Sequence, residues 1–156
     1  MENKKHPGVY VPPPLIYAAF FFLSHLLQKQ WPLPNSWQET IAARAAAWIM
    51  FVLCFLILFA ALRRFAASKN TLVTVRPASS LQTTGIYAIT RNPMYLGLLL
   101  LYDGVAIFKG NAWTMLLLPL LMITIQQVVI RKEEQYLQEA FGEDYETFRK
   151  KVRRWI

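Results

Sequence analysis

Cysteine and acidic residues are scarce in this 156-residue chain. Its one cysteine, Cys54, excludes a disulfide within the chain and a metal site built from several thiolates, and we expect no bound metal. Charged residues make up 17% of the chain, against about 25% in an average soluble domain. With 55% hydrophobic and 14% aromatic residues, the composition also excludes an intrinsically disordered protein.

The most prominent feature of the sequence is its long uncharged runs. Residues 45–62 are all apolar, and residues 112–130 carry no charge. A helix needs about 20 mostly apolar residues to cross the hydrocarbon layer of a bilayer, so both runs qualify. Buried core helices of a soluble protein are the alternative, but apolar runs of this length are typical of transmembrane helices.

Two weaker runs, residues 12–28 and 93–108, flank the strong ones. The first begins with three prolines, which suit a helix start. Lys4 and Lys5 precede it and raise the alternative of a signal peptide, but no small-x-small cleavage site follows, so we expect a retained helix. We therefore predict one all-α, polytopic membrane domain over residues 1–156, with spans at about 12–28, 44–63, 93–108 and 112–131.

The basic residues predict the orientation of these spans. Of 17 Lys and Arg, only Lys29, Arg44 and Lys109 fall on one side, and the other fourteen fall on the opposite side. Because basic loops stay in the cytoplasm, we expect both termini there, with the basic surface facing the anionic inner leaflet of the plasma (inner) membrane. The net charge of +8 then needs no nucleic acid as a partner. Apart from the lipid bilayer, we infer no obligate partner.

Polar sequence gathers on the cytoplasmic side, in a connection at residues 63–92 and a tail at residues 131–156. The tail predicts a helix, a break at Phe141-Gly142, and a second helix with a basic last turn. An apolar stripe on that second helix favours an amphipathic helix on the bilayer surface or over the bundle, with a solvated tail as the alternative. The stripe consists of Tyr145, Phe148, Val152 and Trp155.

A first cluster of potential binding groups, residues 84–97, leads into the predicted third span. Asn92 precedes Pro93 and so avoids the helical conformation, which predicts Asn92 as the N-cap. The free N–H groups at the start of that helix can hold a carboxylate or phosphate. Tyr87 and Tyr95 add aromatic faces, and Gly97 permits close approach of another helix.

A second cluster, Arg131-Lys132-Glu133-Glu134, lies just beyond the predicted fourth span on the same side of the membrane. Its two adjacent carboxylates could bind a cation, and a solvated, charged helix end is the alternative. Because both clusters fall on the cytoplasmic side, we expect them to form one site.

Together the two clusters resemble a known family. The pattern Gly85-x-Tyr87-x3-Arg91-Asn92-Pro93-x-Tyr95-x-Gly97, then Glu133-Glu134-x2-Leu137-x3-Phe141-Gly142-x2-Tyr145, looks like the isoprenylcysteine carboxyl methyltransferases. The related phospholipid N-methyltransferases share much of it. The resemblance covers residues 80–156. It implies an integral membrane methyltransferase that uses S-adenosylmethionine (SAM) and acts on a lipophilic, lipid or prenylated acceptor at the cytoplasmic face.

The resemblance also implies roles for individual residues. Cofactor contacts fall on Ser80, Leu81, Gln82, Tyr87, Asn92, Pro93, Met94, Tyr95 and Glu133. Catalytic roles fall on Arg91, Asn92 and Glu134. The chemistry is compatible, because the SAM carboxylate suits Arg91 or the helix N-terminus, and its ammonium or ribose hydroxyls suit Glu133. The sulfonium suits the face of Tyr87 or Tyr95.

Two positions depart from the family pattern. The family commonly has His at the position of Asn92, which forms hydrogen bonds but is no base near neutral pH. Its eukaryotic members place a substrate-contacting Arg at the position of Val129, and we expect Arg131 to take over this substrate-binding role. Two alternatives stay open: a phospholipid N-methyltransferase, and a non-catalytic membrane subunit or carrier that kept the fold.

Overall fold

The computed structural model describes residues 8–67 and 80–156, and every regular element in these two ranges is helical. This confirms the predicted all-α class. The elements are α1 (Pro13–Gln30), η1 (Ser36–Glu39), α2 (Ile41–Ala67), η2 (Gly85–Ala88), α3 (Pro93–Lys109), α4 (Ala112–Ile125), η3 (Gln126–Ile130) and α5 (Arg131–Lys151). Here η1 and η2 are short 3-10 helices, and η3 is a π-helical turn. Part of the predicted connection, residues 68–79, and the basic residues Lys4, Lys5, Lys69 and Arg76 lie outside the described residues.

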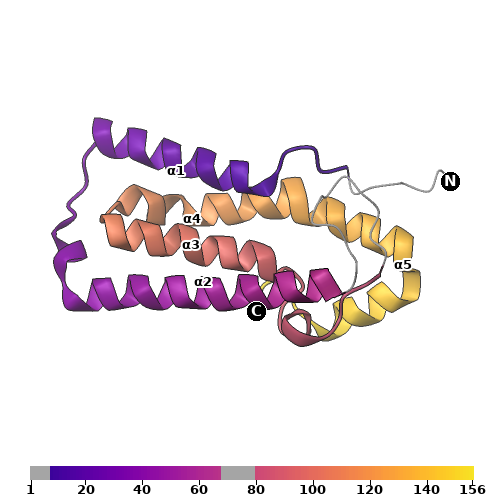
Figure 1. Ribbon diagram of the computed structural model, residues 1–156. Helices are drawn as coiled ribbons and strands as arrows, with labels where there is room; N and C mark the ends of the chain where they lie inside the picture. The colour runs from indigo at the N-terminus through magenta and orange to yellow at the C-terminus, as the bar shows by residue number, and fades with distance from the viewer. Residues whose placement is uncertain (1–7, 68–79) are drawn as a thin grey trace.

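Four long helices lie side by side in the order α1, α4, α3, α2 (Figure 1). The most extensive contact joins α2 to α3, followed by the contacts of α4 with α1 and with α3. At one end of the bundle, short connections join α1 to α2 and α3 to α4. At the other end, η2 leads into α3 and α5 turns back, so this end collects both clusters of potential binding groups (Figure 1).

Proline and glycine set the boundaries of several helices. Pro13 and Pro93 lie in the first turns of α1 and α3, where a missing N–H leaves no hydrogen bond unmade. Gly110 ends α3 in the left-handed conformation, with φ of 65°. The helical run from α4 through η3 into α5 spans 40 residues and is interrupted at the predicted break, where Gly142 has φ of 52° and ψ of −121°.

Two glycines bring α2 and α3 into close contact. A Cβ atom added at Gly97 would lie 2.7 Å from Cδ2 of Leu58, and one added at Gly104 would lie 2.8 Å from Cε1 of Phe51. Both separations are far shorter than a van der Waals contact, so larger side chains would force the two helices apart. The predicted close approach at Gly97 is therefore confirmed, and it fixes the position of α3 against α2.

Polar side chains join α1 to α4 inside the bundle. The hydroxyl groups of Ser24 and Thr114 lie 2.7 Å apart, and both residues are completely buried. The Asn111 side chain accepts a hydrogen bond from the backbone N–H of Thr114 and so caps α4. Such hydrogen bonds give two apolar helices a specific register, which dispersion contacts alone do not provide.

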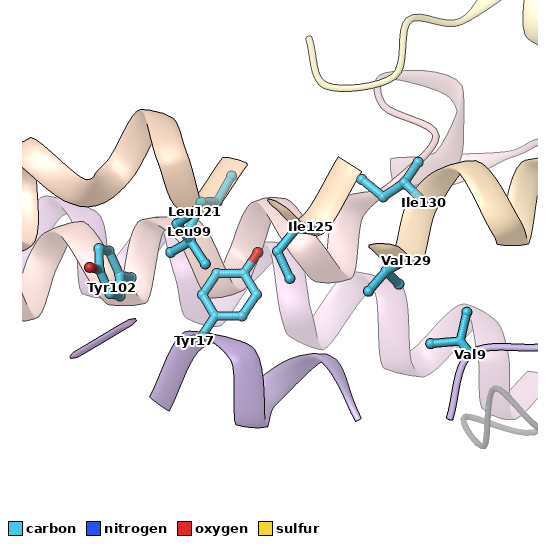
Figure 2. Close-up of a cluster of buried hydrophobic side chains, with 8 residues drawn as sticks. All are labelled: Val9, Tyr17, Leu99, Tyr102, Leu121, Ile125, Val129 and Ile130. Carbon is cyan, nitrogen blue, oxygen red and sulfur yellow. The ribbon is translucent and has the colours of Figure 1, made fainter. Parts of the chain in front are cut away.

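The main cluster of buried apolar side chains lies between α1, α3 and the α4–η3 run (Figure 2). Its members are Val9, Tyr17, Leu99, Tyr102, Leu121, Ile125, Val129 and Ile130. Tyr17 packs edge-on against Tyr102, with ring centroids 6.4 Å apart. This cluster continues to η3 and so connects the centre of the bundle to the end that carries Glu133.

The outer surface of the bundle is strongly apolar. Trp48, Phe55 and Phe59 of α2 are 61%, 66% and 55% exposed. Among the described helices, α2 and the run Ala112–Lys151 are long and apolar enough to cross a membrane. Exposed apolar faces of this extent are unusual for a soluble monomer and are what lipid tails cover in a bilayer. These two helices therefore indicate a membrane protein.

Candidate functional site

The turn at residues 90–92, between η2 and α3, is held by the returning C-terminal segment. The backbone N–H of Arg91 donates to the carbonyl oxygen of Arg153 at 3.0 Å. The carbonyl oxygen of Arg154 accepts from Thr90 Oγ1 at 3.2 Å and from Asn92 Nδ2 at 2.8 Å. Hydrogen bonds thus hold residues more than 60 positions apart together at one end of the bundle.

Tyr95 and Glu133 bring the two sequence clusters into direct contact. The Tyr95 hydroxyl, in the first turn of α3, donates a 2.6 Å hydrogen bond to Oε1 of Glu133, in the first turn of α5. Tyr17 of α1 donates to the backbone carbonyl of Tyr95 at 2.9 Å and so supports this turn. Three different helices therefore position one carboxyl group.

The Glu133 carboxyl has an unusual affinity for protons. Burial removes water from the carboxylate and is the largest cause of a pKa raised to about 7. The hydrogen bond from Tyr95 opposes this rise, and the neighbouring Glu134 charge adds to it. Near neutral pH, this carboxyl group therefore exchanges between its charged and neutral forms.

Tyr87 lies close to the same carboxyl group. Its ring is buried and packs against Phe65 of α2, with centroids 5.9 Å apart. Burial raises the pKa of the Tyr87 hydroxyl, and the negative charge of Glu133 raises it further. Tyr87, Tyr95 and Glu133, three of the predicted cofactor contacts, thus gather at one place with two aromatic rings and one carboxyl group.

Glu134 faces another set of partners. Its Oε1 lies 3.1 Å from Nη2 of Arg91, and its two oxygens accept from Nε and Nη2 of Arg154 at 2.9 and 2.6 Å. Arg91 also donates to the hydroxyl of Tyr145 at 3.4 Å. Two predicted catalytic residues, Arg91 and Glu134, thus form an ion-pair network with Arg154 that ties α5 to the turn before α3.

Asn92 occupies the predicted position before α3, but its side chain makes no capping hydrogen bond, and that part of the expectation is wrong. The amide instead donates to the Arg154 carbonyl, because the returning chain offers a closer partner. The backbone N–H of Asn92 donates to Thr90 Oγ1 at 3.2 Å. With Pro93 as the first helical residue, one fewer N–H group is left to cap.

Two of the other predicted cofactor contacts pack close to Tyr87. Leu81 and Met94 pack against a second buried cluster. That cluster consists of Ala61, Tyr87, Tyr145, Phe148 and Val152. Gln82 Nε2 donates to Ser80 Oγ at 2.9 Å, and Pro93 is completely buried at the start of α3. Three residues of the predicted amphipathic stripe are thus buried over the end of the bundle.

Arg131, the predicted substrate contact, is exposed and lines a cavity of about 410 Å³ between the two arms of α5. Glu134, Tyr145 and Arg154 also line this cavity, whereas Tyr95 and Glu133 do not. The structure therefore places Arg131 beside the ion-pair network rather than beside the Tyr95–Glu133 pair. Val129, where the family pattern has Arg, is completely buried.

Sequence reasoning missed the contacts of three residues at this end of the bundle. Arg154 forms the bidentate pair with Glu134, and Tyr145 receives a hydrogen bond from Arg91. Arg64, at the end of α2, lies against Gly85. The apolar stripe had indicated that Tyr145 is buried, but nothing in the order of the sequence distinguishes Arg64 or Arg154 from the other basic residues.

Comparison with known proteins finds two related sequences. A stretch of 63 residues is 38% identical to an uncharacterized protein of Haemophilus influenzae, covering 40% of this chain and all of that protein. A stretch of 72 residues is 40% identical to the protein-S-isoprenylcysteine O-methyltransferase of Schizosaccharomyces pombe, covering 46% of this chain but only 30% of the yeast protein. No solved structure matches significantly.

The profile of the phospholipid methyltransferase family matches residues 42–144, which is more than half of the chain. The matched range begins in α2 and includes Tyr87, Tyr95, Glu133 and Glu134. The protein is therefore a member of the phospholipid methyltransferase family, and a membrane methyltransferase of the isoprenylcysteine and phospholipid type.

Proposed function

We propose that this protein transfers the methyl group of SAM to a lipophilic acceptor at the cytoplasmic face of the membrane. The observation that carries the proposal is the contact between Tyr95 and Glu133, with Tyr87 nearby, at one end of an apolar bundle. This arrangement offers a half-buried carboxyl group and two aromatic rings to a cationic nucleotide. The family membership supports methyl transfer as the chemistry.

The residues of this site fit SAM. The half-buried carboxylate of Glu133, whose pKa is raised by the loss of water around it, gains from a positive partner, and the SAM ammonium or ribose hydroxyl groups supply suitable donors. The faces of Tyr87 and Tyr95 attract a sulfonium through the cation–π interaction. Ser80 and Gln82 add polar groups beside the apolar side chains of Leu81 and Met94, which suits a nucleoside.

In this proposal, α1, α2, α3 and the α4–η3 run each cross the bilayer. Lys29, Arg44 and Lys109 then lie at the end of the bundle that carries the short connections. The described basic residues at the other end, with the site, face the cytoplasm according to the positive-inside rule. Both termini are cytoplasmic, and Glu133 lies just beyond the crossing segment 112–131.

The reaction we propose is an in-line displacement. The methyl–sulfur bond breaks as the acceptor nucleophile forms a bond to the methyl carbon, and the sulfur keeps the electron pair. The protein's part is to hold both reactants in line and to exclude water, because SAM supplies the reactive methyl group when bound. We assign Arg91, Asn92 and Glu134 to positioning this site, and their contact with reacting atoms stays a prediction, as does substrate binding by Arg131.

A carboxylate acceptor needs no base, whereas a protonated amine must first lose a proton. The relative from Schizosaccharomyces pombe is by its name an O-methyltransferase, which favours a carboxyl acceptor. The second candidate, a phospholipid amine, is favoured by the matching family, whose description is phospholipid methyltransferase.

Purified protein in mild detergent should bind SAM in calorimetry, and Glu133→Gln should weaken that binding about tenfold. Glu146→Gln is the matched control, because Glu146 lies on the same helix, its side chain is 31% exposed, and it pairs with Arg149 rather than with Tyr95. Equal affinity of both variants and the unaltered protein would contradict the assignment of Glu133.

Radiolabelled SAM then identifies the acceptor class. Membranes and a prenylcysteine peptide serve as acceptors, and the product is treated with alkali. A methyl ester releases labelled methanol, whereas an N-methyl group stays in the lipid fraction. SAM binding without any transferred label would favour the non-catalytic alternative.

A further inference from the structure

Arg64 lies against the turn that leads into the site. It belongs to the last turn of α2, next to Phe65, whose ring packs against Tyr87. A Cβ atom added at Gly85 would be 3.5 Å from Nε and 3.6 Å from Cδ of Arg64. These separations are ordinary van der Waals distances, so the arginine side chain packs along this turn.

The guanidinium group of Arg64 has unused binding capacity. Its Nε is buried without a hydrogen-bond partner. Within residues 8–67 and 80–156, the ion pairs of arginines are those of Arg91, Arg149 and Arg154, and none involves Arg64. A buried charged donor without an acceptor is costly, so an anionic ligand at this turn would satisfy a group that the described protein leaves unsatisfied.

Arg91 is the competing arginine at this end of the bundle. Its Nε is buried without a hydrogen-bond partner, like that of Arg64, but its side chain is only 9% exposed and its two Nη atoms already contact Glu134 and Tyr145. Releasing Arg91 for a ligand would break that network and leave the Glu134 carboxylate with one arginine fewer. Arg64 takes part in no ion pair among the described residues. Its planar guanidinium group matches a carboxylate in two parallel hydrogen bonds.

We infer that Arg64 binds the carboxylate of the SAM amino-acid group, a role the sequence pattern had suggested for Arg91 or the helix N-terminus. The inference rests on the proposed function and divides the recognition of SAM between two residues. Glu133 faces the cationic part of the molecule, and Arg64 faces its anionic part. Tyr87 packs against Phe65, the residue after Arg64, and lies close enough to Glu133 for that charge to raise the pKa of its hydroxyl.

The test compares SAM with decarboxylated SAM, which keeps the sulfonium, the ammonium and the nucleoside. Calorimetry in detergent measures both ligands on the unaltered protein, Arg64→Gln and Arg63→Gln, with thermal melting as the check of folding. Arg63 is the matched control because it is the exposed neighbour of Arg64 on the same helix. Arg64→Gln should weaken SAM about tenfold or more and leave decarboxylated SAM unchanged.

An unchanged SAM affinity in Arg64→Gln, or an equal loss for both ligands, would overturn the inference while leaving SAM binding itself intact. Absence of SAM binding by the unaltered protein would overturn the proposed function and this inference together. If Arg64→Gln does not fold, Arg64→Lys carries the test, because lysine keeps the charge but loses the fork. The measured quantity is then the ratio of the affinities for SAM and decarboxylated SAM. If this ratio is as large in Arg64→Lys as in the unaltered protein, the inference is overturned.

Discussion

The Tyr95 hydroxyl donates to the Glu133 carboxyl group across 2.6 Å and thereby joins the first turn of α3 to the first turn of α5. The same contact joins the two short sequence clusters on which the family resemblance rests. Because the hydrogen bond favours the charged carboxylate while burial favours the neutral acid, Tyr95 controls how much of Glu133 is ionised near neutral pH.

Tyr95→Phe should therefore shift the pH dependence of ligand binding. Without the hydrogen bond, the pKa of Glu133 rises further above about 7, so the carboxylate that attracts SAM forms only at higher pH. Calorimetry between about pH 6 and 8 should show SAM affinity rising with pH, with the variant's midpoint higher than that of the unaltered protein.

Tyr17→Phe is the control for this shift. Tyr17 donates to the backbone of Tyr95 and not to the carboxyl group, so its removal should weaken binding, if at all, without moving the midpoint. Coincident midpoints for Tyr95→Phe and the unaltered protein would contradict the role of Tyr95.

Glu133 should lower the stability of the ligand-free protein above neutral pH. Its folded-state pKa of about 7 lies above the ordinary value of 4.5, so the folded state binds the proton more tightly than the unfolded state. The resulting stabilisation is complete below about pH 4.5 and is lost as pH rises through 7. Glu133→Gln stays neutral throughout and should therefore be more stable than the unaltered protein at pH 8, by about 1 kcal/mol or more.

Thermal melting of both proteins in the same detergent, at pH 5 and pH 8, tests this difference. The gain from Glu133→Gln should be confined to the higher pH and should accompany weaker SAM binding. A gain of equal size at pH 5 would mean that the substitution acts through packing and not through the buried charge.

The helical class and the position of this site were predictable from particular residues. The uncharged runs indicated long helices, and Pro93, Gly110 and Gly142 lie where α3 starts, where it ends and where α5 breaks. Counting spans placed Tyr95 and Glu133 at the same end of the bundle, because one helical hairpin separates them. Contacts between helix ends can thus be inferred from the order and length of the helices in the sequence.

The partners of Glu134 and Asn92 were not predictable in this way. Both interact with Arg154, which reaches them only because the chain reverses at Gly142 and continues beyond α5. The sequence indicates the break, but the direction taken after it depends on burying Tyr145, Phe148 and Val152 against the bundle. Only this packing against the bundle distinguishes Arg154 from the other basic residues of the tail.

The ion-pair network around Glu134 should contribute far more to stability than an exposed pair on the same helix. Glu134→Gln leaves Arg91 and Arg154 without their carboxylate, and the Arg91 side chain is only 9% exposed, so we expect a loss of about 3 kcal/mol. Glu146→Gln breaks the pair with Arg149, whose side chain is 51% exposed, and should cost under about 1 kcal/mol. Denaturation of both variants at one salt concentration gives the comparison, and similar losses would contradict a structural role of Glu134.

Close packing at Gly97 should be essential for the position of α3 and hence of Tyr95. Gly97→Ala places a methyl group 2.7 Å from Cδ2 and Cγ of Leu58, so the Leu58 side chain or one of the two helices must move, at a cost of about 1–3 kcal/mol. Truncating the partner residue opens space at the same point. The double variant Gly97→Ala/Leu58→Ala should therefore be more stable than the sum of the two single losses predicts, and SAM affinity should recover with it. Thermal melting of the four proteins forms the cycle, and strict additivity would show that Leu58 is not what Gly97 accommodates.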